Sequence, residues 1–482
     1  MNTSPAFVLR PTAWLLATAL AMLSACTTMA PSYEPPSAAA PTAFKEAPAA
    51  GSTWFPAAPA DALDRGPWWQ LFGDPILSKL VGQVEVSNQN VAAAVAAYAQ
   101  AQALVRQQRA ALFPSLAIDA GVTRSGGAAA LGKPTNLQLG LSASWEPDVW
   151  DRLRLAVSSA QASAQASAAN LAAARLSAQA ALATDYFALR EADNEVALLT
   201  AAVSAYQRAL TITENQYKMA IAQRTDVLQA QTQLETTRAN LIAKVGQRAL
   251  LEHAIALLVG KAPADFSIAV APWDTKVPAV PLVVPSALLQ RRPDIAAAER
   301  AVAAANAQIG IQRAAYFPSL ALSASYGGAG STLPNLFRAS NTLWSLGLSA
   351  AQTVFDAGAI AARVEGAQAA RDAAVANYRQ TVLAAFQAVE DELATSRSLA
   401  EQESQRRAAS ADADRTEQLT LNQYLQGQVP YTSVVAAQVS ALGARQTLSQ
   451  LMSSRQAAAV ALIQAMGGGW HAPGTDASAA AR

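Results

Sequence analysis

Much of the chain carries its apolar residues at a spacing of seven, which is the pattern of helices that pack as coiled coils. Residues 148–245 and 367–426 contain no Gly or Pro, as expected of long uninterrupted helices. One seam is formed by Leu182, Leu189, Val196, Val203 and Leu210. The pattern predicts helices over 76–111, 152–218, 224–259, 285–315, 357–424 and 431–466.

Between these helices the spacing changes to two, which is typical of strands with one buried face. The alternating runs lie at 116–122, 137–143, 320–326 and 343–351 and predict two hairpins, at about 113–146 and 317–354. Strands of about ten residues with apolar alternation are typical of membrane barrels. Four strands cannot close a barrel, and lipid does not tolerate open strand edges. We therefore expect several chains to share one barrel; three would give 12 strands, whereas two would give a barrel too narrow for an open lumen.

Two halves of the chain resemble each other. RAALFPSL at 109–116 matches RAAYFPSL at 313–320 at seven of eight positions, and Asn-Gln-Tyr occurs at both 215–217 and 422–424. We expect an internal repeat of roughly 68–260 and 285–467. A linker over 261–284 would join the copies, and a tail over 468–482 would follow them.

The first 25 residues have the features of a signal peptide. Arg10 precedes an apolar stretch of about 12 residues, which is too short to span a bilayer. The stretch ends in Leu23-Ser24-Ala25-Cys26, which resembles the bacterial lipobox, and Cys26 is the sole cysteine of the chain. We expect cleavage before Cys26, a covalent lipid on its thiol, and a Pro/Ala-rich linker over 26–67.

Composition argues against several classes of function. The 35 basic and 34 acidic residues give a net charge of +1, which favours no nucleic-acid partner. One cysteine and two histidines leave little for metal binding or nucleophilic catalysis. Composition therefore argues against most enzymes, although it leaves carboxylate-based ones open. No set of residues nominates an active site, so we expect no enzyme, no metal and no cofactor other than the lipid on Cys26.

Several motifs together resemble the outer-membrane factors of tripartite efflux systems, the TolC/NodT-type lipoproteins. They are the lipobox, Trp68-Trp69, Trp145-Glu146-Pro147-Asp148-Val149-Trp150, TDVLQAQTQLETTRANL from Thr225 and the long motif RRPDIAAAERAVAAANAQIGIQRAAYFPSL from Arg291. The resemblance implies a mainly α protein with a membrane β-barrel. Three protomers would form a 12-stranded barrel in the outer membrane and a periplasmic α-barrel of long coiled-coil hairpins. The homotrimer would passively conduct drugs or other small molecules, received from an inner-membrane RND-type pump through a periplasmic adaptor.

The same resemblance assigns roles to the tips of the helical hairpins, over 217–226 and 424–433. In this family the tips close the periplasmic end through hydrogen bonds and ion pairs between neighbouring helices. The gate residues implied here are Tyr424, Asp226, Thr225 and Arg224. The implied adaptor-contacting residues are Met219, Ala220, Ile221, Gly427 and Gln428. The family often has Gly at both turns, so Ala220 departs from its pattern.

Two alternatives remain open at this point. An exit duct for type I protein secretion would have the same fold and a different pump. A structural coiled-coil lipoprotein of the envelope would explain the helices and Cys26 but leaves the strand hairpins unexplained.

Overall fold

The computed structural model describes residues 29–37, 40–41, 43–46, 67–124, 135–278 and 291–468. The expected signal peptide, Cys26, most of the linker over 26–67 and the tail beyond Gly468 lie outside these residues. The chain divides into two compact units. Unit 1 takes in the described residues of Met1–Ser37, Ala99–Ala166 and Ala298–Tyr378, and unit 2 those of Ala38–Tyr98, Ser167–Ala297 and Arg379–Arg482.

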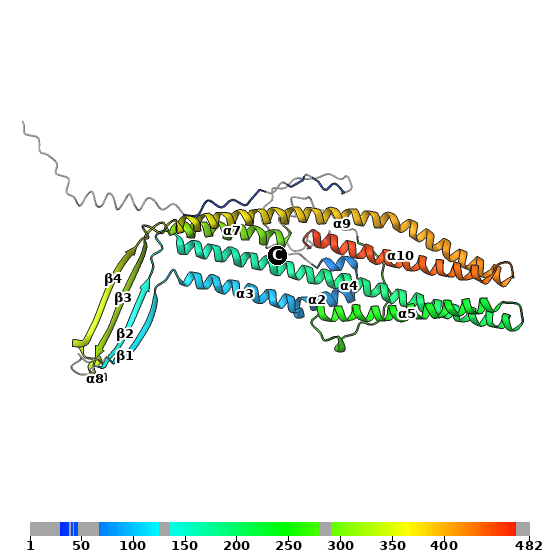
Figure 1. The fold of residues 1–482 in the computed structure, drawn as a ribbon, viewed down its shortest axis with the longest axis horizontal. Coiled ribbons are helices and arrows are strands. Elements are labelled where there is room, and N and C mark those ends of the chain that lie inside the picture. Colours follow the sequence, from blue (N-terminus) through cyan, green and yellow to red (C-terminus); the bar gives the residue numbers. More distant parts are fainter. Residues whose placement is uncertain are drawn as a thin grey trace, which may run out of the picture. The chain divides into compact units, whose positions relative to one another are not determined.

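Unit 1 contains one antiparallel sheet of four strands (Figure 1). The strands are β1 (Ser115–Arg124), β2 (Thr135–Trp145), β3 (Ser319–Gly330) and β4 (Thr342–Ala351), in the order β1-β2-β3-β4. Two short helices, α8 (Leu333–Leu336) and η3 (Ala339–Asn341), connect β3 to β4. Each strand therefore pairs with its neighbour in sequence, although α4, α5 and α7 lie between β2 and β3 in the chain.

Two of the helices attached to the sheet, α4 and α7, meet at one packed junction beside it. Trp150 follows β2 just before α4 (Arg152–Lys218), and Phe317 lies between α7 (Pro293–Ala314) and β3. The two rings stack with centroids 4.8 Å apart, and the Trp150 Nε1–H donates to the Pro318 carbonyl at 2.7 Å. This contact fixes the start of α4 against the end of α7 in unit 1.

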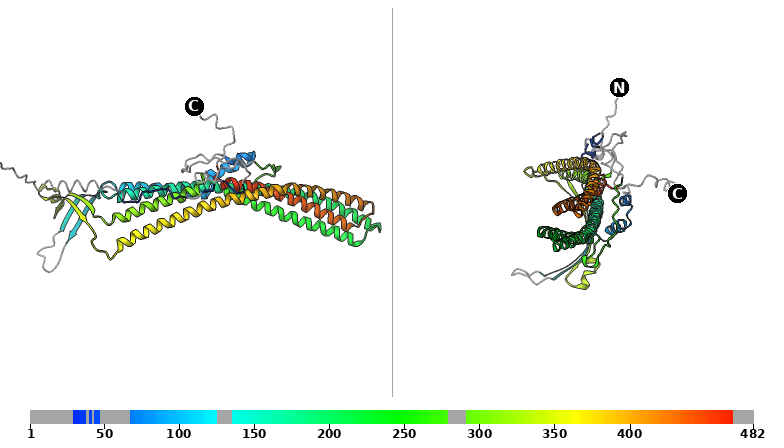
Figure 2. Two further views of the ribbon diagram at one scale, coloured as in Figure 1. Left: turned by 90° about the horizontal axis from the view of Figure 1, so that it is seen from above. Right: turned by 90° about the vertical axis from the view of Figure 1, so that its right-hand side faces the viewer.

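Unit 2 is built from two antiparallel helical hairpins that lie side by side, with both turns at the same end (Figures 1 and 2). One hairpin joins α4 to α5 (Arg224–Leu258), and the other joins α9 (Ala359–Leu425) to α10 (Tyr431–Ala465). α4 and α9 have 67 residues each, and α5 and α10 have 35 each. Seam residues of both hairpins share one buried cluster, which includes Leu199, Leu210, Val227, Leu234 and Val434. The mainly helical fold expected from the seven-residue spacing is thus confirmed.

A second core lies where short elements cover the hairpin bases. η1 (Trp68–Phe72) and α2 (Pro75–Ser87) pack there, and η2 (Pro263–Asp265) follows α5. Trp68 is 1% exposed, and its Nε1–H donates to the Gln179 side chain at 3.2 Å. The aromatic residues of η1 therefore join the N-terminal part of unit 2 to the long helix α4.

The helix predicted over 76–111 is wrong in one respect, because the structure divides it into α2 and α3 (Gln89–Ala110). Asn88 separates them with an extended backbone, and its Oδ1 accepts hydrogen bonds from the amides of Asn90 and Val91. Its Nδ2 donates to the Leu258 carbonyl at 2.8 Å. An Asn side chain that binds its own backbone in this way competes with the helix.

Candidate functional site

The two hairpin turns have the same backbone geometry despite their different sequences. Gly427 has φ 75° and donates to the Tyr424 carbonyl at 2.9 Å. Ala220 has φ 56° and donates to the Tyr217 carbonyl, also at 2.9 Å. A left-handed backbone strains any residue with a Cβ, so Ala220 carries a strain that Gly427 avoids. Next to it, Met219 and Ile221 expose 63% and 70% of their surface, as a docking tip would require.

The candidate gate residues of the first tip engage their own helix. The Asp226 carboxylate accepts from the Gln223 amide at 3.1 Å and so caps the start of α5. The Thr225 hydroxyl donates to the Gln223 side chain at 3.4 Å. The Arg224 guanidinium lies 5.8 Å from the centroid of the Tyr217 ring. Within one protomer these residues stabilise the turn itself.

Tyr424 joins the two hairpins to each other. Its hydroxyl donates to Gln216 Oε1 at 2.6 Å, and its ring lies 5.2 Å from that of Tyr431. Burial raises the pKa of Tyr424 and raises that of Tyr431 to about 12, so both phenols stay neutral. In the described part of one protomer the Tyr424 hydroxyl is bound by Gln216 and not by Asp226. The expected pair between neighbouring hairpins stays a prediction.

Three contributors to the tips were missed by the sequence reasoning, namely Gln216, Gln223 and Tyr431. The sequence held one signal for Gln216. The Asn-Gln-Tyr triplet at 215–217 matches the triplet at 422–424, so Gln216 directly precedes Tyr217, the counterpart of Tyr424. Tyr431 is 2% exposed and begins α10, and no local pattern marks it as buried.

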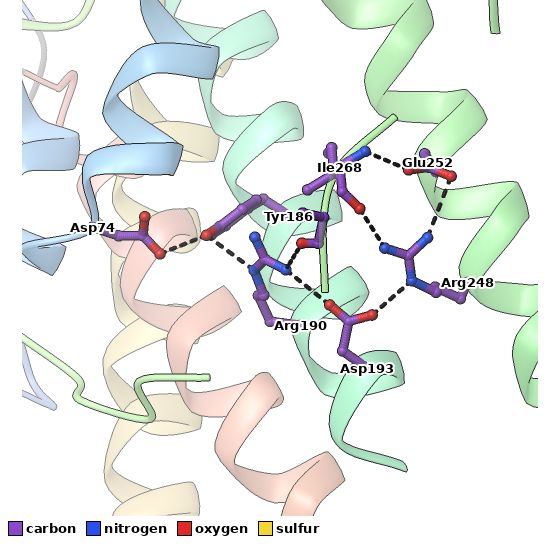
Figure 3. Close-up of polar contacts among 8 residues, drawn as sticks. Asp74, Tyr186, Arg190, Asp193, Arg248, Glu252 and Ile268 are labelled. Carbon is purple, nitrogen blue, oxygen red and sulfur yellow. Dashed lines mark hydrogen bonds and ion pairs between the residues drawn. The ribbon is translucent and has the colours of Figure 1, made fainter. Parts of the chain in front are cut away.

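A buried polar network holds the segment after α5 against the hairpin base (Figure 3). Asp193 of α4 accepts from Arg190 at 2.8 Å and from Arg248 of α5 at 2.6 Å. Both guanidinium groups also donate to backbone carbonyls of the segment, Arg248 to Ile268 at 2.6 Å and Arg190 to Ala269 at 2.9 Å. Each cation therefore has an anionic partner and further hydrogen bonds, as burial of a charge requires, although Arg190 Nη2 has no hydrogen-bond partner among the described residues.

Tyr186 of α4 connects this network to the start of α2. The Tyr186 hydroxyl donates to Asp74 Oδ2 at 2.6 Å and accepts from Arg190 Nε at 3.1 Å. Asp74 also caps α2 by accepting from the amides of Ile76 and Leu77. One carboxylate thus fixes both the start of α2 and its attachment to α4.

A second buried cluster, one helical turn away, has more acids than cations. Glu191 and Glu195 of α4 both approach Lys244 of α5; the Glu195 contact is direct, and the Glu191 oxygen is 3.8 Å away. Glu191 is 7% exposed, and its Oε1 has no hydrogen-bond partner among the described residues. Burial, with the hydrogen bond and charge of Glu195, raises the pKa of Glu191 to about 7. The pair therefore holds a proton near neutral pH.

The sheet of unit 1 has one apolar face and one polar face. The register places Leu141 opposite both Ile118 and Tyr326, so all three share a face. The same face carries further large apolar side chains that are exposed, namely Leu116, Val122, Leu139, Trp344, Leu346 and Leu348. A sheet surface of this kind requires an apolar medium or partner over it.

The opposite face carries hydroxyls and a carboxylate. The Ser142 hydroxyl donates to Asp119 Oδ2 at 2.6 Å, and the hydroxyls of Ser325 and Ser345 lie 2.9 Å apart. Leu343 is the large apolar exception on this face. Side chains that bind water line one side of the sheet, as in a strand that separates lipid from an aqueous lumen.

The segment that follows the candidate lipidation site lies along α7 in unit 1. The Tyr33 hydroxyl contacts the Glu299 carboxylate, and Asn306 Nδ2 donates to the Pro31 carbonyl at 2.9 Å. Burial and the Glu299 carboxylate raise the pKa of Tyr33. A Cβ on Gly310 would lie 2.7 Å from the Ala30 amide nitrogen, so this position requires glycine for the contact.

Neither metal ligation nor a helical membrane span is found in the described ranges. No three His, Cys, Asp or Glu side chains come together there in an arrangement suited to a metal ion. None of the helices in those ranges combines the length and the apolar character needed to cross a bilayer.

Comparison with known proteins gives the family. The profile described as outer membrane efflux protein matches residues 80–261 and 284–468. The probable outer membrane lipoprotein SilC of Salmonella typhimurium is 29% identical over 93% of this chain and 97% of its own. The cation efflux system protein CusC of Escherichia coli is 30% identical over 85% of this chain and 90% of its own.

A solved structure agrees with the sequence matches. The open state of the Neisseria gonorrhoeae MtrE outer membrane channel matches with a TM-score of 0.80 and 27% identity, over 92% of this chain and 98% of its own. Because the profile covers most of the chain and CusC is 30% identical across most of both proteins, this protein belongs to the outer membrane efflux protein family.

Proposed function

We propose that this protein is the outer-membrane channel of a tripartite efflux pump and conducts small molecules passively out of the cell. The observation that carries the proposal is the two-faced sheet, with an apolar face for lipid and a polar face for an aqueous lumen. A purely structural coiled-coil lipoprotein of the envelope does not account for a sheet with one apolar and one polar face. The relatives SilC and CusC are named as an outer membrane lipoprotein and a cation efflux protein, which supports the same reading.

The channel is a homotrimer in this proposal. The outer strands β1 and β4 each have a partner on one side within the chain. Their free edges would be unsatisfied in hydrocarbon, so they must pair with strands of other copies. Three copies supply 12 strands, which is enough for a barrel with an open lumen.

The proposal also assigns roles to the other parts of the chain. Residues 1–25 are a cleaved signal peptide, and a lipid on Cys26 anchors the mature chain in the outer membrane. The chain contains two copies of one repeat, at 68–260 and 285–467. The helical hairpins of both copies form a periplasmic α-barrel. The matched lengths of α4 with α9 and of α5 with α10 support this.

The hairpin tips are the gate and the docking point of the periplasmic adaptor. Tyr424 and Asp226 of neighbouring hairpins close the tunnel, assisted by Thr225 and Arg224. The exposed Met219 and Ile221, with Ala220, Gly427 and Gln428 at the two turns, contact the adaptor that connects to an RND-type pump. The transported substrate is a small molecule.

The test is the mass of the detergent-extracted protein, measured by light scattering with detergent subtraction, followed by conductance in planar bilayers. A trimer that forms water-filled channels is the expected result. A stable monomer without conductance would refute the proposal, since its four strands could not be sealed in lipid. Cys26→Ser, a matched control, should abolish acyl labelling and leave the conductance unchanged.

A further inference from the structure

An apolar pocket lies between the sheet of unit 1 and the connection from β3 to β4. Its volume is about 390 Å³, and it is lined chiefly by Ile118, Leu139, Leu141, Tyr326, Leu336 and Phe337. We propose that this pocket binds an acyl chain of a phosphorylated lipid in the membrane leaflet at the loop end of the barrel. The proposal rests on the proposed function, because it requires the apolar face of the sheet to meet the membrane.

The connection containing α8 folds onto the apolar face of the sheet. Gly328 lies opposite Leu139 in the register, and it therefore shares the face of Leu139 and Tyr326. A Cβ added to Gly328 would lie 2.3 Å from the Leu336 carbonyl oxygen, so the chain at Leu336 passes directly over this face. The pocket thus opens on the side of the sheet that we assign to lipid.

The chemistry of the lining selects hydrocarbon. The pocket walls carry no charged side chain, and their polar side chains are the Tyr326 and Thr342 hydroxyls. The backbone of Gly140, Gly327 and Gly328 forms part of the floor. Phe337 remains 75% exposed beside the pocket, although Leu336 is 8% exposed. A ligand without polar groups along its length matches such a cavity.

The loop end of the sheet carries positive charge near the pocket. Arg124 ends β1, and Arg338 follows α8 by two residues; both are exposed. The described residues from Tyr326 to Thr342 and from Gly121 to Arg124 include no Asp or Glu. α8 lies at this end of the strands in Figure 1. A phosphate group above the pocket would therefore meet arginines without a competing carboxylate.

A second copy of the chain is a poorer occupant. The pocket is lined mainly by the central strands β2 and β3, whereas neighbouring protomers would join at the outer strands β1 and β4. The backbone pairing that closes the barrel therefore leaves the pocket open to the membrane. Acyl chains are the apolar groups available there.

The experiment measures lipid binding to the purified full-length trimer by native mass spectrometry. Lipid A, whose phosphates are anionic, is the probe, and phosphatidylcholine, whose phosphate charge is balanced by its choline, is the comparison. We expect lipid A to bind at least about tenfold more tightly than phosphatidylcholine, because its uncompensated phosphate charge can pair with the arginines. Arg338→Gln should reduce this preference several-fold.

Pocket variants separate specific from general lipid binding. Leu139→Trp fills the pocket and should weaken lipid A binding about tenfold, and Phe337→Ala, in the exposed connection, should weaken it about threefold. The matched control is Leu348→Trp, which lies on the same apolar face outside the pocket lining and should leave affinity within twofold.

Two outcomes would overturn the inference. Equal affinities for Leu139→Trp and Leu348→Trp, or equal binding of lipid A and phosphatidylcholine, would mean that lipid coats the barrel without occupying a site. The trimer mass and conductance of each variant are measured alongside. If the wild-type trimer conducts but shows no preference for lipid A, only this inference is refuted. If the wild type forms neither a trimer nor a conducting channel, the proposed function itself is refuted.

Discussion

The acid pair at the base of the first hairpin should make the stability of unit 2 depend on pH. Glu191 and Glu195 of α4 share one cation, Lys244 of α5. The neighbouring charged groups Arg190, Asp193, Arg248 and Glu252 bind one another. From α10, the neutral side chains of Ser449 and Gln450 bind Asn194 and Glu195. One carboxylate of the pair therefore has no cation of its own, and a proton on Glu191 removes the surplus charge.

The magnitude follows from the pKa of Glu191, which rises from an ordinary 4.5 to about 7, chiefly because the side chain is buried. The folded state then binds a proton that the unfolded chain releases. The contribution of this proton to stability is fully present below pH 4.5 and is lost as the pH rises through about 7. A difference of about 2.5 pKa units corresponds to a loss of about 3 kcal/mol across that range.

The perturbation is Glu191→Gln, which keeps the shape of the side chain and removes its charge. Thermal and denaturant unfolding, followed by far-ultraviolet circular dichroism between pH 5 and pH 8.5, would measure the slope of stability against pH. We expect the wild type to lose about 2.5 kcal/mol more than the variant over this interval, because part of the change lies below pH 5. The matched control is Glu235→Gln, because Glu235 is 57% exposed and paired with Arg238.

The reasoning would be refuted if Glu191→Gln and the wild type showed the same slope. It would also fail if Glu235→Gln flattened the slope as much as Glu191→Gln, since that would point to general surface charge. A slope of opposite sign would mean that Glu191 is ionised in the fold and stabilised by Lys244.

Three further perturbations test other parts of the structure. Ala220→Gly should stabilise the protein by about 1 kcal/mol by relieving the left-handed backbone at φ 56°, while Gly427→Ala should destabilise it by a similar amount; unchanged melting temperatures would contradict this. Gly310→Leu should release the Ala30 segment and speed proteolysis of the N-terminal region, whereas Gly246→Ala, where a Cβ meets open space, should leave the rate unchanged. Asp226→Ala should remove the cap of α5, at about 1 kcal/mol, and raise single-channel conductance by loosening the closed tip; conductance equal to the wild type would exclude Asp226 from the gate.

Local patterns in the sequence were sufficient for most elements. The predicted helices over 152–218 and 224–259 correspond closely to α4 and α5, because a sustained heptad spacing and the absence of Gly and Pro leave few other conformations. The strand runs were equally visible, since alternation with a period of two is a local property. The break at Asn88 was not visible in the apolar spacing. The Asn88 side chain caps α3 through its own backbone, but the bond to the distant Leu258 carbonyl that accompanies the break exists only in the fold.

For the candidate sites, too, some features could be predicted from the sequence and others depended on the tertiary structure. The sequence by itself determined the family, the positions of the hairpin tips and the two faces of each strand, and it predicts the lipobox at Cys26, since all of these depend on neighbouring residues or short periods. Only the tertiary structure decided that Tyr424 binds Gln216, that Ala220 adopts a left-handed backbone, and that Glu191 and Glu195 share one lysine. These features depend on which side chains long-range packing brings together and on how deeply it buries them, and neither property is encoded in local spacing.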